Sequence, residues 1–269
     1  MNSFDYNNFQ VVSETITNAI KGFANIFHEI QNLINENREA IIGTLSIMTD
    51  LGTLFSASEI LAKNQIVFTD DLHLDFAKAI CDDADNVDDL VKQYYFQNEG
   101  EHLNVLIKRC YGAKQTASRQ GLFDEIIEAL NREHYMLACV GLFSLVDGLL
   151  SEVESTMKNA IKFNKRLESI QKKVVEKTEL CEFDLKTMRI TESIDKLDDY
   201  SIFAFSNFSG EEPNGLNRHW LVHGRTTRRD YSRYDFLKIL LWLDAIIFLD
   251  NVNNDLDELN STDITETNC

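Results

Sequence analysis

The chain has 269 residues, enough for one large domain or two smaller ones with a substantial buried core. Its 11 glycines and single proline are too few for the turns of a many-stranded fold, so we expect an all-α protein. The formal net charge of −18 favours solubility and opposes nonspecific binding to nucleic acid.

Cysteine usage and hydropathy indicate the compartment. The five cysteines are Cys81, Cys110, Cys139, Cys181 and Cys269. They form no close pair and no metal-type spacing, which fits a reducing compartment better than a disulfide framework. The first residues lack the basic and apolar regions of a signal peptide. The longest apolar stretch, Phe236 to Leu249, is too short to span a bilayer. We therefore expect a soluble cytoplasmic protein with no membrane partner.

Helical patterns dominate the N-terminal part of the chain. Apolar residues recur at helical spacing from Phe9 to Ile34, and a second helical stretch follows through Met48. Ser56 and Glu59 have the spacing of a capping box, which predicts the start of a short helix toward Lys63. Three more helices are predicted over Leu72–Ala84, Val87–Phe96 and Glu101–Tyr111, the last one ended by Gly112. We interpret residues 1–115 as a helical module of unknown role.

Longer helices are predicted beyond that boundary. They cover Leu122–Leu130, His134–Val153, a basic segment from Thr156 to about Leu180, and Leu185–Leu197. A loop follows over Phe205–Gly215, and Ser232 with Asp235 forms a capping box for a final helix, Tyr234–Val252. We expect a helical bundle over residues 116–252. The acidic residues 253–269 are predicted to be a disordered tail.

The segment most informative about function is Asn217 to Arg225, N-R-H-W-L-V-H-G-R. It places Arg218 and His223 five positions apart. An imidazole transfers protons near neutral pH, and a guanidinium stabilises a phosphate whose charge is growing, so the pair suits phosphodiester cleavage without a metal. On an ideal helix the two residues are about 140° apart. We therefore expect a helix start after an Asn217 cap, ended by Gly224, or a site completed across a dimer.

Two other interpretations of this segment stay open. His219 and His223 share a helix face, as metal ligands do, but Trp220 replaces the glutamate of an H-E-x-x-H site and no third ligand is evident. In a purely structural alternative, Arg218 bonds loop carbonyls while both histidines pack against the fold. We predict neither a metal nor a cofactor.

Basic residues gather around the motif despite the acidic net charge. Leu216 to Lys238 holds five arginines and one lysine against two aspartates. Lys158 to Lys177 is also basic, although a solvated helix face is a plain alternative there. We expect RNA to contact the arginines that follow the motif: Arg225, Arg228, Arg229 and Arg233.

From roughly Ser118 to Val252, the chain resembles the HEPN superfamily of helical-bundle domains, found in toxins, phage-defence proteins and RNA-processing factors. Arg218 and His223 fit its R-x4–6-H signature, and the wider N-R-H-x-x-x-H-G form is similar to one bacterial branch. Tyr135–Leu150 looks like the upstream core helix of that branch, with an acidic residue followed by glycine. The N-terminal half resembles no family that we recognise.

The resemblance implies a metal-independent endoribonuclease that acts as a homodimer, with the two motifs lining a shared cleft. It implies that His223 is the general acid/base, that Arg218 stabilises the phosphate, and that Asn217 and His219 shape the site. Asp147 would orient Arg218 or His223, with a solvated helix charge or a core salt bridge as the alternative. One toxin branch carries a tyrosine two residues after the histidine as a target of silencing. Arg225 stands there in this chain, which argues against that regulation.

These features predict RNA cleavage by attack of the ribose 2′-OH on the adjacent phosphorus, with DNA spared. The expected setting is bacterial abortive infection against phage or a toxin system, where an inhibitor or antitoxin protein would be a further partner. One alternative is a non-catalytic HEPN-like module that binds RNA, a nucleotide or a protein. Another is a helical scaffold whose dimer seam contains these residues.

Overall fold

The computed structural model describes residues 38–69, 72–153, 190, 212–213, 215–228 and 230–266, with side chains between residues 48 and 251. Its α-helices are α2 (Arg38–Lys63), α3 (Leu74–Asp82), α4 (Val87–Phe96), α5 (Glu101–Gly112), α6 (Gln120–Asn131), α7 (Tyr135–Val153), α10 (Arg218–Val222) and α11 (Arg233–Glu266). Short 3-10 turns occupy Ala84–Asn86, Asn98–Gly100 and Lys114–Arg119. No strand occurs among these residues, so the prediction of an all-α fold is confirmed.

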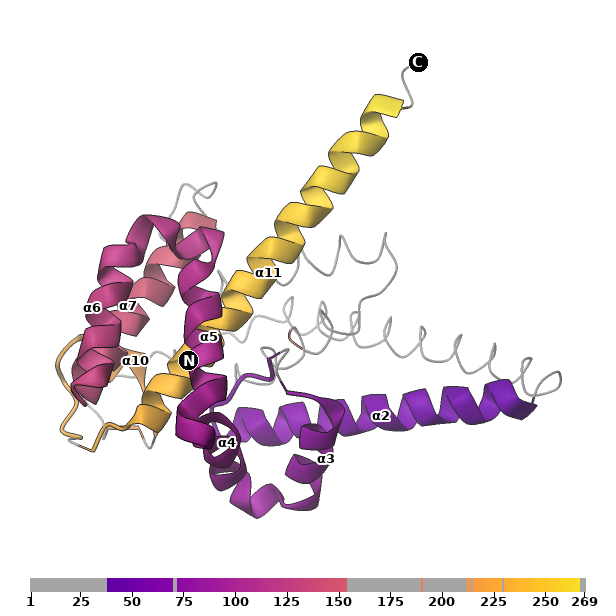
Figure 1. Cartoon of the computed structure of the whole chain (residues 1–269), viewed down its shortest axis with the longest axis horizontal. Helices are drawn as coiled ribbons and strands as arrows, with labels where there is room; N and C mark the ends of the chain where they lie inside the picture. The colour runs from indigo at the N-terminus through magenta and orange to yellow at the C-terminus, as the bar shows by residue number, and fades with distance from the viewer. Residues whose placement is uncertain are drawn as a thin grey trace, which may run out of the picture. The chain divides into compact units, whose positions relative to one another are not determined.

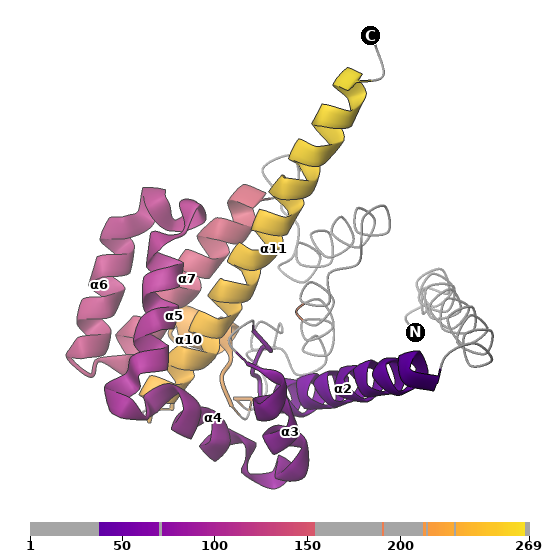
Figure 2. The same cartoon turned by 45° about the vertical axis from the view of Figure 1, so that its right-hand side comes forward.

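The central helices of the fold are α7 and α11. α7 packs against α6, α10 and α11, while α5 packs against α4 and α11. Figures 1 and 2 show α5, α6, α7 and α11 running alongside one another. From Phe236 to Leu249 every side chain of α11 is buried except Lys238 and Phe248. A helix that is apolar on all sides belongs in a core. None of the described helices, α11 included, is both long and apolar enough for a membrane span.

The chain divides into two compact units, residues 1–52 and 53–269. The boundary predicted between residues 115 and 116 therefore lies inside the second unit rather than between units. The physical reason is that α5 packs on α11, so elements before and after residue 115 share one core. Arg109 of α5 reinforces this packing, because its Nε and Nη2 donate to the two carboxylate oxygens of Asp244 on α11 at 2.7 and 2.8 Å.

Helical periodicity located most of the described helices. The bounds of α4 agree with the prediction, and Gly112 is the last residue of α5. The predicted helix start at Ser56 is wrong, because Leu54, Ala57 and Leu61 continue one buried face through α2. In the segment predicted to be a disordered tail, the structure continues α11 up to Glu266, through residues that include no proline or glycine. The helices predicted within residues 1–37 and 154–197 lie outside the described residues, apart from residue 190.

Replacing Asp244 with alanine should destabilise this core. The side chain of Asp244 is 9% exposed and that of Arg109 is 37% exposed, so the change removes two charge-assisted hydrogen bonds at the edge of the core. We expect the free energy of unfolding to fall by about 2 to 3 kcal/mol, measured by urea denaturation. Glu128→Ala is the matched control, because it removes the partner of Arg132 from an exposed pair and should cost less than about 0.5 kcal/mol. Equal losses in the two variants would contradict this role of the α5–α11 pair.

Candidate functional site

The motif forms a short helix, α10, with a cap at each end. Asn217 has an extended backbone, and its Oδ1 accepts a hydrogen bond from the Trp220 N–H at 3.1 Å. At the other end Gly224 has φ +64°, a left-handed conformation that favours glycine. The Gly224 N–H bonds the Leu221 carbonyl at 3.1 Å, and the Arg225 N–H bonds the Trp220 carbonyl at 2.9 Å. This pair of bonds is a Schellman motif, so the predicted Asn217 cap and Gly224 stop are both confirmed.

Arg218, in the first turn of α10, pairs with Asp147 on α7. Its Nε donates to Asp147 Oδ2 at 3.0 Å, and its Nη2 donates to the same oxygen. The two side chains are 22% and 29% exposed, so the pair is half-buried but still reachable from solvent. A guanidinium carries five N–H donors, and these bonds use two of them. Of the two partners expected for Asp147, the structure places Arg218 against it.

The two histidines of the motif lie against each other. Their ring centroids are 4.7 Å apart in an edge-to-face arrangement with an interplanar angle of 72°. His219 is partly buried, whereas His223 is exposed at the C-cap of α10. Burial lowers the pKa of His219, and the positive charges of His223 and Arg218 lower this pKa further. His219 is therefore mostly neutral at pH 7, and it interacts electrostatically with both His223 and Arg218.

The arginines after the motif have different surroundings. Arg225 is exposed directly after Gly224, and Arg229 lies outside the described residues. Arg228 is tied to carboxylates: its Nε donates to Asp230 at 2.8 Å, and its Nη2 donates to Asp235 at 2.9 and 3.1 Å. The structure thus gives Arg228 a role in holding the loop to the start of α11. Its predicted contact with RNA stays a prediction.

The capping box at the start of α11 is confirmed. Asp235 Oδ2 accepts bonds from the N–H and the hydroxyl of Ser232, at 2.9 and 2.8 Å. The Asp235 N–H donates back to the Ser232 hydroxyl at 3.3 Å. Because Asp235 also binds Arg228, this cap joins the basic loop to the buried helix.

Two residues that position the motif had no signal in the sequence. Gln65 bonds both backbone groups of Leu216: its amide donates to the carbonyl at 3.1 Å, and its Oε1 accepts from the N–H at 2.9 Å. Glu212 accepts bonds from the hydroxyls of Thr226 and Thr227, and from the Thr227 N–H at 2.8 Å. Desolvation raises the pKa of Glu212, but these hydrogen bonds outweigh it and lower the pKa overall. The two residues fix the chain just before and just after α10.

Among the described residues, no group of three or more His, Cys, Asp or Glu side chains gathers as metal ligands would. In comparisons with known proteins, no family model, no curated protein and no solved structure matches the chain. The chemical function is therefore inferred from the side chains of the motif and their surroundings.

Removing the N-cap should loosen α10. Asn217→Ala deletes the acceptor for the Trp220 N–H, and we expect the free energy of unfolding to fall by about 1 kcal/mol in urea denaturation. Asn217→Ser keeps an oxygen that caps helices well, so it should retain most of this stability. A serine variant as unstable as the alanine variant would show that Asn217 acts through something other than its cap.

The stability of the protein should fall between pH 7 and pH 5.5, in part because of His219. The pKa of His219 is lowered in the folded chain, so in this range the unfolded chain binds more protons at this residue. Lowering the pH then favours unfolding. We expect His219→Gln to reduce the slope of unfolding free energy against pH, measured by denaturant titrations at several pH values. Identical slopes for wild type and variant would contradict a buried, neutral His219.

Proposed function

We propose that the protein is an endoribonuclease that cleaves RNA without a metal ion, with Arg218 and His223 as its reacting side chains. The observation that supports this most is the geometry of α10: its first turn carries a guanidinium held by Asp147, its C-cap carries the exposed imidazole of His223, and both side chains act electrostatically on His219 between them in the sequence. We include in the proposal that the second half of the chain is a HEPN-like domain.

The reaction follows from these two groups. His223 takes the proton of a ribose 2′-OH, whose oxygen then forms a bond to the adjacent phosphorus. Arg218 donates hydrogen bonds to the phosphoryl oxygens while negative charge builds on them. The bond from phosphorus to the 5′-oxygen breaks, and that oxygen receives a proton from a general acid. The products are a 2′,3′-cyclic phosphate and a 5′-hydroxyl end. DNA lacks the attacking hydroxyl and is not cleaved.

Asp147 acts in this scheme as a positioning residue. Two N–H donors of Arg218 bond its carboxylate, which leaves three donors that can reach a phosphate. A guanidinium held in place before RNA arrives loses less conformational freedom when it binds the transition state. Since the pair is only half-buried, a phosphate can approach it from solvent.

A homodimer would complete the chemistry. Cleavage needs a base for the 2′-OH and an acid for the 5′-oxygen, and each chain offers one exposed histidine in the motif. A two-fold axis beside α10 brings a second His223 to the same phosphate. We propose this arrangement for the active form. Bacterial phage defence or a toxin system is the proposed setting, with an inhibitor or antitoxin protein as a further partner.

One observation favours a non-catalytic alternative. Arg228 is occupied by Asp230 and Asp235, and the chain carries a net charge of −18. Both features reduce the attraction for a long polyanion. In this alternative the HEPN-like module binds RNA, a nucleotide or a protein partner without cutting it.

Purified protein should cut single-stranded RNA, and the cut should survive EDTA. We expect Arg218→Ala and His223→Ala to lower the cleavage rate by about 100-fold or more, measured with end-labelled RNA. Asp147→Asn should lower the rate less, because its amide oxygen still accepts a bond from Arg218. Arg132→Ala, which changes an exposed cation at the C-cap of α6, is the control for general charge effects. RNA that binds wild type without being cut, and binds His223→Ala equally, would support the non-catalytic alternative instead.

A further inference from the structure

A second cluster of basic residues lines a pocket of about 700 Å³ between α4 and the start of α11. Four of the lining side chains are cations: Lys92, Arg228, Arg233 and Lys238. Three are carboxylates: Asp88, Asp230 and Asp235. The lining therefore carries one excess positive charge in a chain whose net charge is −18.

Most of these charges are paired across the walls of the pocket. Arg228 bonds Asp230 and Asp235. Lys238 lies 3.9 Å from Asp88, whose carboxylate also accepts the Tyr234 hydroxyl at 2.8 Å. Lys92 Nζ lies 3.2 Å from Asp89, which is not part of the lining. These contacts fix the walls, and they leave one of the four cations without a carboxylate partner among the described residues.

That cation is Arg233, which forms no ion pair with any described residue. Its guanidinium lies over the ring of Phe96, 5.2 Å from the ring centroid. It also lies close to Gly100, where an added Cβ would come within 2.9 Å of Arg233 Nη2. Glycine thus makes room for the guanidinium, and the Phe96 ring restrains it. Stacking occupies the face of a guanidinium and leaves its N–H donors, which point outward in the plane, to bind an anion.

Two ammonium groups lie near the same cavity. Lys92 Nζ and Lys238 Nζ lie 5.0 and 4.6 Å from the centroid of the Tyr234 ring. The side chain of Lys238 is only 12% exposed. Burial lowers the pKa of Lys238, although Asp88 and Asp235 oppose this effect. An anion in the pocket would stabilise the charged form of this lysine.

We propose that this pocket binds a phosphate group, carried by an RNA strand or by a free nucleotide, with Arg233 as the main ligand and with Lys92 and Lys238 supplying further positive charge. Gly215 and Leu216 form part of the lining and directly precede the Asn217 cap, so a bound phosphate contacts the segment that positions Arg218. Where the source is RNA, this proposal rests on the proposed function; where it is a nucleotide, it stands alone.

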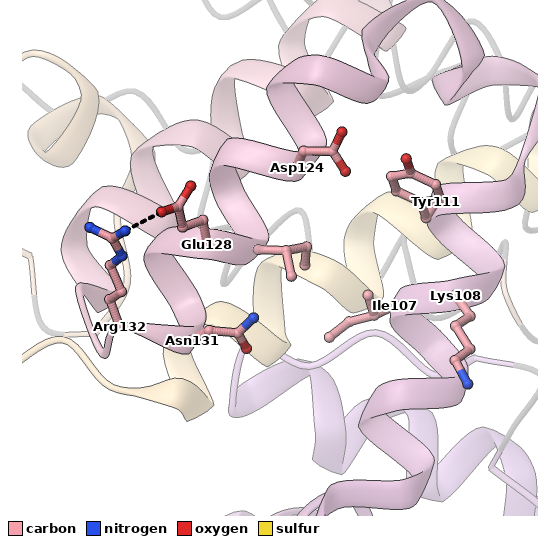
Figure 3. A pocket seen from close by; sticks show the side chains of 8 residues that line it. Ile107, Lys108, Tyr111, Asp124, Glu128, Asn131 and Arg132 are labelled. Carbon is pink, nitrogen blue, oxygen red and sulfur yellow. Dashed lines mark ion pairs between the residues drawn. The ribbon is translucent and has the colours of Figure 1, made fainter.

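A second pocket provides a matched control. It has a volume of about 470 Å³ and lies between α5 and α6, where Figure 3 shows its side chains. Its lining has two cations, Lys108 and Arg132, and two carboxylates, Asp124 and Glu128. Arg132 is paired with Glu128 there, as the dashed line in Figure 3 marks. Loss of Arg132 therefore removes one positive charge from the protein without touching the proposed site.

Binding can be measured by titration calorimetry on the full chain with three probes: inorganic phosphate, adenosine monophosphate, and a short RNA with 2′-O-methyl groups that block cleavage. We expect Arg233→Gln to weaken the binding of the preferred probe by about tenfold, since it removes charge-assisted hydrogen bonds to the phosphate. Lys238→Gln should weaken it as well. Arg132→Gln should bind like wild type, and thermal melting checks that each variant is folded.

The outcomes distinguish RNA from a free nucleotide as the source of the phosphate, and they test the pocket separately from the proposed ribonuclease activity. Binding of phosphate and the mononucleotide, but not of the RNA, identifies a free nucleotide as the ligand, whereas tighter binding of the RNA identifies the strand. These measurements do not depend on cleavage, so a protein that cuts no RNA can still confirm the pocket. The proposal is overturned if wild type binds none of the probes, or if Arg233→Gln binds as tightly as Arg132→Gln.

Discussion

The ion pair between Arg218 and Asp147 is the interaction on which the site depends. A helix of five residues has no stability of its own, because the cost of nucleation exceeds the gain from its few hydrogen bonds. α10 is therefore held from outside, by its two caps and by the bond from Arg218 to a core helix. The same bond that anchors α10 also sets the direction of the guanidinium. Fold stability and the proposed chemistry thus share one contact.

Electrostatics near the motif differ from the charge of the whole chain. At physiological ionic strength, exposed charges more than about 8 Å apart are largely screened, so distant carboxylates have little effect on a phosphate at α10. The electrostatic potential near the motif depends instead on which neighbouring arginines are paired with carboxylates. Arg228 is neutralised by Asp230 and Asp235, whereas Arg233 rests on an aromatic ring. An acidic protein can therefore present a basic surface wherever its local carboxylates are already bonded.

The sequence predicted the helices and helix caps of the site better than the long-range contacts that hold them in place. Helical spacing gave α4, and the residue types of Asn217 and Gly224 gave both ends of α10, because caps depend on neighbours within a few positions. The pairing of Arg218 with Asp147, 71 positions away, was expected only from resemblance to a family. The contact between Gln65 and Leu216 spans 151 positions, and no pattern in the sequence predicts it. The packing of α5 on α11 likewise depends on distant residues, and so the predicted boundary at residue 115 missed it.

The most direct test of the central claim is the chemistry of RNA ends in cells that express the protein. Mapping these ends in cells with wild type, beside cells with His223→Ala, separates cleavage by the motif from background turnover. We expect wild type to produce new 5′-hydroxyl ends, matched by 2′,3′-cyclic phosphates or their hydrolysis products, and His223→Ala to produce none. The same ends in both strains, or new ends that carry 5′-phosphates, would contradict the account.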